Sequence, residues 1–170
     1  MFERTLLTLT AAAATLVAGT LAASAQTPTR LDQFQAWGVY KYEQGGKTAC
    51  FALSKPIAAE PRSVNHGDNW FFVYKRPDAN VNLEPEVRAG YNLKADAQVR
   101  VTVDNQTFEF DPSDASAWMS NAAKEPAFVE AAKRGRNMVV NATSKRGTNT
   151  KYTYSLMGVT KALNKVASCS

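Results

Sequence analysis

The sequence has little of what catalysis and metal binding usually require. Among its 170 residues there is one histidine, His66, and there are two cysteines, Cys50 and Cys169. It contains no glycine-rich phosphate loop, no C-x-x-C pair and no G-x-S-x-G turn that would present a nucleophilic serine. A zinc site needs about four ligands, more than this set supplies. We therefore expect no metal, no cofactor and no enzymatic activity, with a hydrolase whose site the sequence hides as an alternative.

Long apolar stretches are also scarce, and the one that occurs is N-terminal. Residues 6–22 carry no charge and precede Ala23-Ser24-Ala25, whose small side chains suit a signal peptidase. This arrangement predicts a cleavable secretory signal over residues 1–25 and a mature chain that begins at Gln26. An uncleaved anchor is the alternative, but four threonines make the stretch only modestly apolar. No later segment is apolar enough to span a bilayer, so we expect no integral membrane segment in the mature chain.

Export would place the two cysteines in an oxidising compartment, where an even number of cysteines indicates disulfide bonding. Only one intramolecular bond is then possible, between Cys50 and Cys169, and both residues lie in segments with an apolar pattern. Closing so long a loop predicts a stabilisation of about 4–5 kcal/mol in chain-entropy models. Two free thiols are the alternative.

After the N-terminal stretch, the dominant pattern is short apolar runs separated by turn residues. The runs predict eight strands, over residues 37–42, 48–54, 70–74, 86–93, 98–103, 106–110, 138–143 and 152–156. Two helices are predicted over residues 126–134 and 159–168, the first with proline at its first position and Gly135 beyond its end. Gly45-Gly46 is expected to close a hairpin, and residues 56–69 to form a loop.

This order of elements predicts a mainly β fold. We expect a β-sandwich or flattened barrel of about eight strands with two short helices, the second at the C-terminus. The predicted parts are the signal over residues 1–25, an extended lead-in over 26–33 and a single β domain over 34–170. Residues 70–74 are apolar on both faces, which predicts a central strand that is covered on both sides.

Positive charge is concentrated near the C-terminus. Residues 124–170 contain nine Lys or Arg and two Asp or Glu, whereas residues 1–123 contain 11 and 13. Such asymmetry is typical of proteins that bind an anionic partner, here lipid headgroups, acidic glycans or an acidic protein face. A well-solvated basic surface without a partner is the alternative, and nucleic acid is not expected for an exported protein. The candidate basic patch consists of Lys133, Arg134, Arg136, Lys145, Arg146 and Lys151.

The remaining polar and aromatic candidates have simpler explanations. His66 lies in the loop over residues 56–69 and is expected to be a solvated loop histidine. Glu84 and Glu86 would share one face of a strand, where they suit an acid pair or a Ca²⁺ ion, but a solvated strand edge is the ordinary explanation. Tyr and Trp side chains in the strands are expected to belong to the core rather than to a ligand platform.

Several short segments are more specific in their order and spacing than any one of them alone. They are Trp37-Gly38-Val39-Tyr40, Cys50-Phe51-Ala52-Leu53-Ser54, Trp70-Phe71-Phe72, Arg134-Gly135 before Met138-Val139-Val140, Ser144-Lys145-Arg146-Gly147-Thr148 before Tyr154-Ser155-Leu156-Met157-Gly158, and the terminal Cys169. Together they resemble the invasion-associated locus B family over roughly residues 34–169.

The resemblance implies a bacterial exported protein, periplasmic or surface-associated, with a compact β-rich fold. The founding member of that family is linked to entry into host cells, and the family has no established enzymatic activity or catalytic residues. We therefore expect an exported, non-catalytic envelope protein that binds an anionic or protein partner, in a role related to host-cell invasion or virulence. A periplasmic structural or stress accessory protein with no host role is the alternative.

Overall fold

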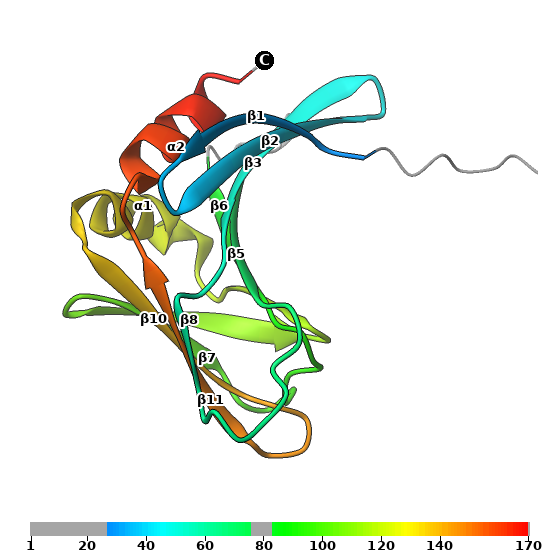
Figure 1. Cartoon of the computed structure of the whole chain (residues 1–170), viewed down its shortest axis with the longest axis vertical. Helices are drawn as coiled ribbons and strands as arrows, with labels where there is room; N and C mark the ends of the chain where they lie inside the picture. Colours follow the sequence, from blue (N-terminus) through cyan, green and yellow to red (C-terminus); the bar gives the residue numbers. More distant parts are fainter. Residues whose placement is uncertain (1–26, 76–82, 170) are drawn as a thin grey trace, which may run out of the picture.

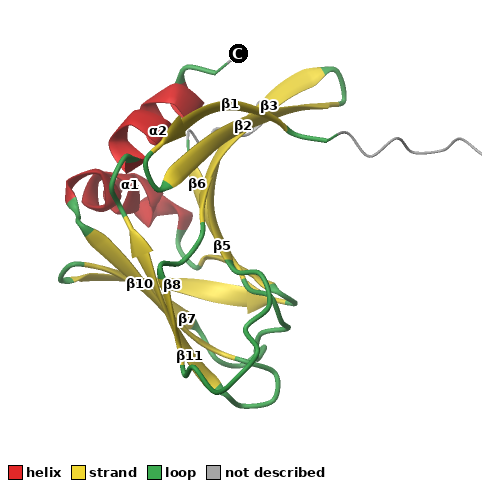
Figure 2. Ribbon diagram, viewed as in Figure 1, coloured by secondary structure: helices red, strands yellow, loops and turns green. Residues whose placement is uncertain are grey.

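The computed structural model describes residues 27–75 and 83–169 (Figure 1). The predicted signal over residues 1–25 lies outside the described residues. In the described part of the chain, eleven antiparallel strands and two α-helices form a mainly β fold (Figure 2). The second helix is C-terminal, as the sequence predicted.

The strands form one open sheet in the order β1-β2-β3-β5-β6-β9-β8-β7-β10-β11-β4. At its two edges, and among the strands of the described residues, β1 pairs only with β2 and β4 only with β11. The bounds of the strands are β1 Thr29–Phe34, β2 Trp37–Gln44, β3 Lys47–Ser54, β4 Ala58–Glu60, β5 Trp70–Lys75, β6 Glu84–Arg88, β7 Val99–Val103, β8 Gln106–Ser113, β9 Ser116–Met119, β10 Asn137–Thr143 and β11 Asn149–Ser155. The helices are α1 (Glu125–Arg134), which follows a 3-10 turn over Ala122–Lys124, and α2 (Val159–Ala167).

The expected sandwich or flattened barrel of about eight strands is corrected by this topology. Each predicted strand overlaps an observed one, but β1, β4 and β9 were not predicted. β1 has mostly exposed side chains, β4 has three residues and β9 has four, so none carries the long alternation that marks a half-buried strand. β4 occupies part of the predicted loop, and most of β1 lies in the predicted lead-in. The result is a single curved sheet with open edges (Figure 1).

Two local predictions about turns had different outcomes. The hairpin is confirmed, since β2 pairs with β3 around Gly45-Gly46, where both φ angles are positive (58° and 75°) and favour glycine. The strand predicted over residues 106–110 was expected to end there, but β8 continues through Asp111 and Pro112. In the described residues β8 pairs with β7 only as far as Phe110, so at Pro112 the strand has a neighbour on one side only. Such a position is like a sheet edge, where a proline without an N–H is tolerated.

Phe71 on β5 is fully buried at the centre of the core. Its ring contacts rings from both halves of the sheet and from α1. The distances between ring centroids are 6.3 Å to Trp37, 6.3 Å to Phe110, 5.6 Å to Phe128 and 5.9 Å to Tyr154. α2 lies across β1, β2, β3 and β5 and also contacts α1. Because aromatic pairs favour defined edge and offset arrangements, this cluster fixes how the two halves of the sheet meet.

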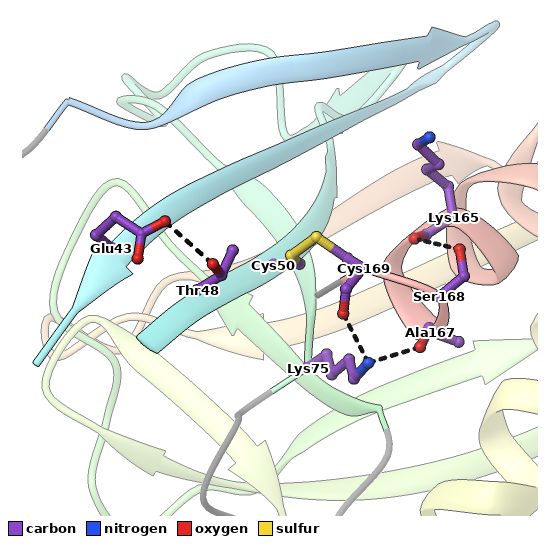
Figure 3. The surroundings of a disulfide bond; sticks show 8 residues. All are labelled: Glu43, Thr48, Cys50, Lys75, Lys165, Ala167, Ser168 and Cys169. Atoms are coloured by element: carbon purple, nitrogen blue, oxygen red, sulfur yellow. Dashed lines mark hydrogen bonds between the residues drawn. A yellow bond between two sulfur atoms is a disulfide. The ribbon is translucent and has the colours of Figure 1, made fainter. Parts of the chain in front are cut away.

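The predicted disulfide is confirmed. Cys50 on β3 and Cys169, two residues beyond α2, are bonded with their Cα atoms 6.3 Å apart (Figure 3). Lys75 at the end of β5 provides a second attachment, because its Nζ donates to the carbonyl oxygens of Ala167 (2.7 Å) and Cys169 (2.8 Å). A cation at these carbonyls also complements the negative end of the helix dipole. The C-terminal end of α2 is therefore held to the sheet both covalently and electrostatically.

Candidate functional site

A cleft of about 550 Å³ lies where three segments of the chain converge. The segments are residues 64–67 before β5, residues 90–92 after β6, and the turn between β10 and β11, with Thr150 on β11 completing the wall. The turn lies at the opposite end of the molecule from α1 and α2 (Figure 1). Lys145 and Arg146 in this turn line the cleft, and we call it the basic cleft.

Close backbone packing positions the first wall of the basic cleft. A Cβ atom on Gly90 would stand 2.4 Å from the carbonyl oxygen of His66, and one on Gly67 would stand 2.6 Å from the carbonyl oxygen of Gly90. Gly67 also has a positive φ of 60°. The buried Asn69 side chain donates to the carbonyl oxygen of His66 (2.8 Å) and accepts from the backbone N–H of Gly90 (3.3 Å). These contacts hold His66 and residue 90 in fixed relation.

Backbone hydrogen bonds join the second wall to the turn between β10 and β11. The N–H of Lys145 donates to the carbonyl oxygen of Asn92 (2.8 Å), and the N–H of Lys94 donates to that of Thr143 (2.9 Å). Within the turn, the Ser144 hydroxyl accepts from the N–H of Thr148 (3.1 Å). The side chains of residues 145 and 146 therefore project from a braced turn rather than from a long loop.

Four polar side chains form a continuous hydrogen-bond chain at the cleft. His66 Nε2 lies 3.0 Å from the carbonyl oxygen of Pro61, and His66 Nδ1 lies 2.9 Å from the Tyr152 hydroxyl. The Tyr152 hydroxyl is 3.1 Å from that of Tyr91, which is 2.5 Å from the Thr150 hydroxyl. Thr150 donates in turn to the carbonyl oxygen of Ala142 (3.2 Å). We call His66, Tyr152, Tyr91 and Thr150 the hydrogen-bond chain.

This chain corrects the expectation that His66 is a solvated loop histidine. The ring is half-buried, both of its nitrogens have partners, and it packs edge-on against the ring of Tyr152. Burial, with the neighbouring Tyr91 hydroxyl as a second cause, raises the pKa of Tyr152 above its ordinary value near 10. Tyr152 is therefore a neutral hydroxyl at physiological pH, able both to donate and to accept a hydrogen bond.

The structure does not bring the six predicted basic residues into one patch. Arg136 precedes β10 and Lys145 follows it, so the seven residues of this strand separate them by about 24 Å or more. Lys133 and Arg134 lie at the end of α1, where both pair with Glu130 (3.2 and 3.7 Å). Lys151 pairs with Glu60 on β4 (3.2 Å). The basic group is thus divided between the two ends of the β10–β11 hairpin.

Lys145 and Arg146 differ from most of the other predicted patch residues in having no acidic neighbour. Both side chains are exposed, and within residues 27–75 and 83–169 neither makes an ion pair. The described lining of the cleft contains no Asp, Glu or Cys. Two cations, a histidine and four hydroxyl side chains therefore line one cleft, and its described lining has no acidic side chain to neutralise the cations.

Comparison with known proteins identifies the family. The family model for "Invasion associated locus B (IalB) protein" matches residues 37–167, which is most of the chain. This chain belongs to the IalB family. A solved structure, the crystal structure of invasion associated protein b from Bartonella henselae, has 15% sequence identity and a TM-score of 0.59, covering 79% of this chain and 92% of that one. At this identity the likeness shows the fold alone. Comparison with curated proteins gives no match.

The predicted acid pair of this IalB family protein is not a solvated strand edge. Glu86 is fully buried, and its carboxylate accepts from Arg88 (2.9 Å) and from the Ser116 hydroxyl (2.7 Å). Glu84 is half-buried on the same strand. Among the described residues no cluster of three or more His, Cys, Asp or Glu side chains could hold a metal ion. Through the hydroxyl of Ser116, the carboxylate of Glu86 links β6 to the neighbouring strand β9.

The prediction that strand Tyr and Trp residues belong to the core holds for one face of the sheet. Trp37, Tyr152 and Tyr154 are buried there. On the opposite face of β2, β3 and β5, partly exposed rings line a shallow depression of about 590 Å³. These rings include Tyr40, stacked on Phe51 at 5.4 Å, and Tyr74. β5 is therefore covered on one side by the core and on the other mainly by its aromatic neighbours.

Sequence reasoning missed Tyr91, Tyr152 and Thr150 as site residues. Each lies in a short segment without a motif, and only the folded sheet brings them to His66. Of the helices in the described part of the IalB chain, none has the length and hydrophobicity needed to cross a bilayer.

Proposed function

We propose that this protein is an exported, non-catalytic envelope protein that binds an anionic partner in the basic cleft. The observation that carries the proposal is the pair Lys145 and Arg146, exposed and without an acidic neighbour in the described residues, beside a lining of hydroxyl groups. Guanidinium and ammonium groups form charge-assisted hydrogen bonds with carboxylates and phosphates. Hydroxyl donors beside them suit the remaining oxygens of such a ligand.

The composition of the cleft supports binding rather than catalysis. A hydrolase would need a nucleophile held by a general base, or two carboxylates. In the described lining, the Ser144 hydroxyl accepts a hydrogen bond from a backbone N–H, and the two His66 nitrogens are hydrogen-bonded to Pro61 and Tyr152. His66 is therefore not placed as a general base for Ser144. Groups suited to holding an oxyanion are present, and an acid–base pair is not found among the described lining residues.

Export is supported by three independent features. They are the predicted signal over residues 1–25, the Cys50–Cys169 disulfide, which is typical of oxidising compartments, and membership of the IalB family. The solved relative is described as an invasion associated protein. We extend a role in surface or host interaction to this chain as part of the proposal. A periplasmic accessory role without a host partner is the second candidate, favoured by a cleft sized for a small anion rather than for a protein surface.

The test is titration with two defined anions at low salt. Glucuronate presents the carboxylate of acidic glycans, and glycerol 3-phosphate presents the phosphate of anionic lipid headgroups. We expect binding of at least one of them by the mature protein, and the preferred anion separates the glycan from the lipid source. Loss of the two charge-assisted contacts in Lys145→Glu/Arg146→Glu should weaken binding by at least about a hundredfold, since each is worth about 1.5–3 kcal/mol.

A matched control keeps the same change in net charge away from the cleft. Lys161 and Lys165 are exposed on α2, at the opposite end of the molecule. Lys161→Glu/Lys165→Glu should therefore bind either anion nearly as well as the unaltered protein. Equal weakening in both double variants would show that the net charge of the protein, and not the cleft, controls binding, and would refute the cleft as the site. Absence of binding by the unaltered protein would also refute the proposal.

A further inference from the structure

The hydrogen-bond chain gives the basic cleft a means of sensing protons. We infer that anion binding in the basic cleft is coupled to protonation of His66, through a reversal in the direction of the hydrogen-bond chain. The inference rests on the proposed function and adds its regulation. It follows from counting the hydrogen atoms that the chain contains.

One end of the chain fixes the hydrogen on His66 Nε2. Its partner at 3.0 Å is the carbonyl oxygen of Pro61, which can only accept. Nε2 therefore carries a hydrogen in every state of this geometry. The other nitrogen, Nδ1, lies 2.9 Å from the Tyr152 hydroxyl. It accepts from that hydroxyl when the ring is neutral and donates to it when the ring is protonated.

The other end of the chain defines one direction for the hydroxyl hydrogens. Thr150 donates to the carbonyl oxygen of Ala142 (3.2 Å), and Tyr152 donates to Tyr91 (3.1 Å). Since each hydroxyl has one hydrogen, Tyr91 then donates to Thr150. The Tyr152 oxygen is left to accept from Nδ1, and only an imidazolium carries hydrogens on both nitrogens. With the hydroxyl hydrogens in this direction, the chain suits an imidazolium, which has a hydrogen on each ring nitrogen.

The neutral ring is accommodated by turning the same hydroxyls around. Thr150 then donates to Tyr91, Tyr91 to Tyr152, and Tyr152 to Nδ1, while Nε2 still donates to Pro61. The only hydrogen bond lost is the one from Thr150 to Ala142. Because only hydroxyl hydrogens move, the chain is bistable without any change in the positions of heavy atoms. Protonation of His66 is thereby transmitted to Tyr91 and Thr150, which line the cleft.

The charges around His66 determine the sign of the coupling. Lys145 and Arg146 from the turn share the cleft with it, Tyr91 and Tyr152 are neutral partners, and no Asp or Glu belongs to the described lining. On its own loop, Asp68 is turned to Lys55 (3.3 Å) and Arg62 is exposed. A protonated His66 adds a third positive charge, which Lys145 and Arg146 oppose and a bound anion favours. Anion binding should therefore take up a proton and strengthen as the pH falls through the range in which histidine titrates.

The sequence makes the first measurement unambiguous because His66 is the only histidine. Its imidazole ¹⁵N chemical shifts report its protonation without assignment of other histidines. Glucuronate is the probe, because its carboxylate stays ionised across the range in which histidine titrates. We expect the protonated fraction of His66 at about pH 7 to rise when glucuronate is added. Calorimetry in buffers of different ionisation enthalpy should show proton uptake on binding.

Affinity for glucuronate should be about fivefold or more higher near pH 5.5 than near pH 7.5, at the lower end of typical couplings between two groups. His66→Gln removes the ionisable ring but leaves Lys145 and Arg146, so it should still bind and lose most of the pH dependence, whereas Tyr152→Phe keeps the ring without its hydroxyl partner and should reduce the pH dependence. Tyr40→Phe, on the opposite face of the sheet, should retain it. Tyr152→Phe gives a second route if His66→Gln does not fold.

Two negative results have different meanings. Glucuronate binding that is equally strong at both pH values, without proton uptake, would overturn the coupling and leave the proposed function intact. If the protein binds neither glucuronate nor glycerol 3-phosphate at either pH, the proposed function itself is overturned. Full pH dependence in folded Tyr152→Phe and His66→Gln would assign the coupling to another group and refute the role of the chain.

Discussion

Removal of the disulfide should act mainly on the unfolded chain, and the structure allows its size to be worked out. The bond joins residues 119 apart in sequence. For a loop of that length, the chain-entropy relation gives about 5 kcal/mol at 25 °C, and removal of native disulfides typically costs about 2–5 kcal/mol. We therefore expect Cys50→Ala/Cys169→Ala to lower the free energy of unfolding by an amount in this range. Exchanging both cysteines avoids a lone thiol.

The native fold should survive this change because the end of α2 has a second attachment. Lys75 bonds to the backbone oxygens of Ala167 and Cys169, and these oxygens remain in the double variant. The far-ultraviolet circular dichroism and the affinity of the basic cleft for glucuronate should therefore be unchanged. The turn between β10 and β11, which lines the cleft, lies at the other end of the molecule from α2 (Figure 2).

The assay is urea unfolding followed by tryptophan fluorescence, with chemically reduced protein as the matched control. An unfolded chain without the cross-link exposes more surface, so the slope m should rise in the double variant as the stability falls. A loss below about 1 kcal/mol, or a large loss with unchanged m, would refute an origin in the unfolded chain.

The remaining predictions concern backbone packing and buried tyrosines. Gly90→Ala would place a methyl group 2.4 Å from the carbonyl oxygen of His66, so it should cost about 1–3 kcal/mol and weaken glucuronate binding, by urea unfolding and calorimetry; an unchanged Kd would contradict the packing of that wall. The Tyr154 hydroxyl is buried without a hydrogen-bond partner in the described residues, so Tyr154→Phe should raise stability by about 1 kcal/mol. Burial raises the pKa of Tyr74, Tyr152 and Tyr154 above the ordinary value near 10. Ionisation of these tyrosines therefore leaves the free energy of unfolding unchanged below about pH 10 and lowers it above that pH, because the unfolded chain ionises first. Thermal unfolding in alkali should show this decline, and Tyr154→Phe should reduce it.

Elements with strong local signals were predicted well from the sequence. Pro126 and Gly135 bracket α1 within one residue of its start and directly after its end, and Gly45-Gly46 mark the β2–β3 hairpin. The cysteine pair also followed from residue count and expected compartment. β1 and β9 were missed because a short strand is stabilised by the strands beside it rather than by its own pattern. The way in which the two halves of the sheet meet depends on contacts of Phe71 with residues far away in sequence, and the periodicity of the sequence does not encode such contacts.

The candidate site shows how charge composition and topology contribute separately. Residues 124–170 contain an excess of Lys and Arg, and the prediction of one basic patch assumed that neighbours in sequence share a surface. An antiparallel hairpin places Arg136 beside Leu156 at one end, where the N–H of Leu156 donates to its carbonyl oxygen (3.0 Å), and Lys145 in the turn at the other end. The separation of Arg136 from Lys145 could have been inferred from the strand predicted between them, since each strand residue advances the chain by about 3.4 Å.

The hydrogen-bond chain had no such signal, because its members come from three segments that only the folded sheet aligns. His66 reaches β11 because Gly67 and Gly90 let two backbones approach more closely than any side chain would allow. A solitary histidine is thereby changed from a loop residue into the end of a chain whose other members each carry one movable hydrogen. Its position next to Lys145 and Arg146, which make no ion pair within the described residues, follows from the turn being braced on Asn92. The two glycines and this brace therefore determine the chemistry of the cleft as much as the charged residues do, although neither glycine carries a functional group.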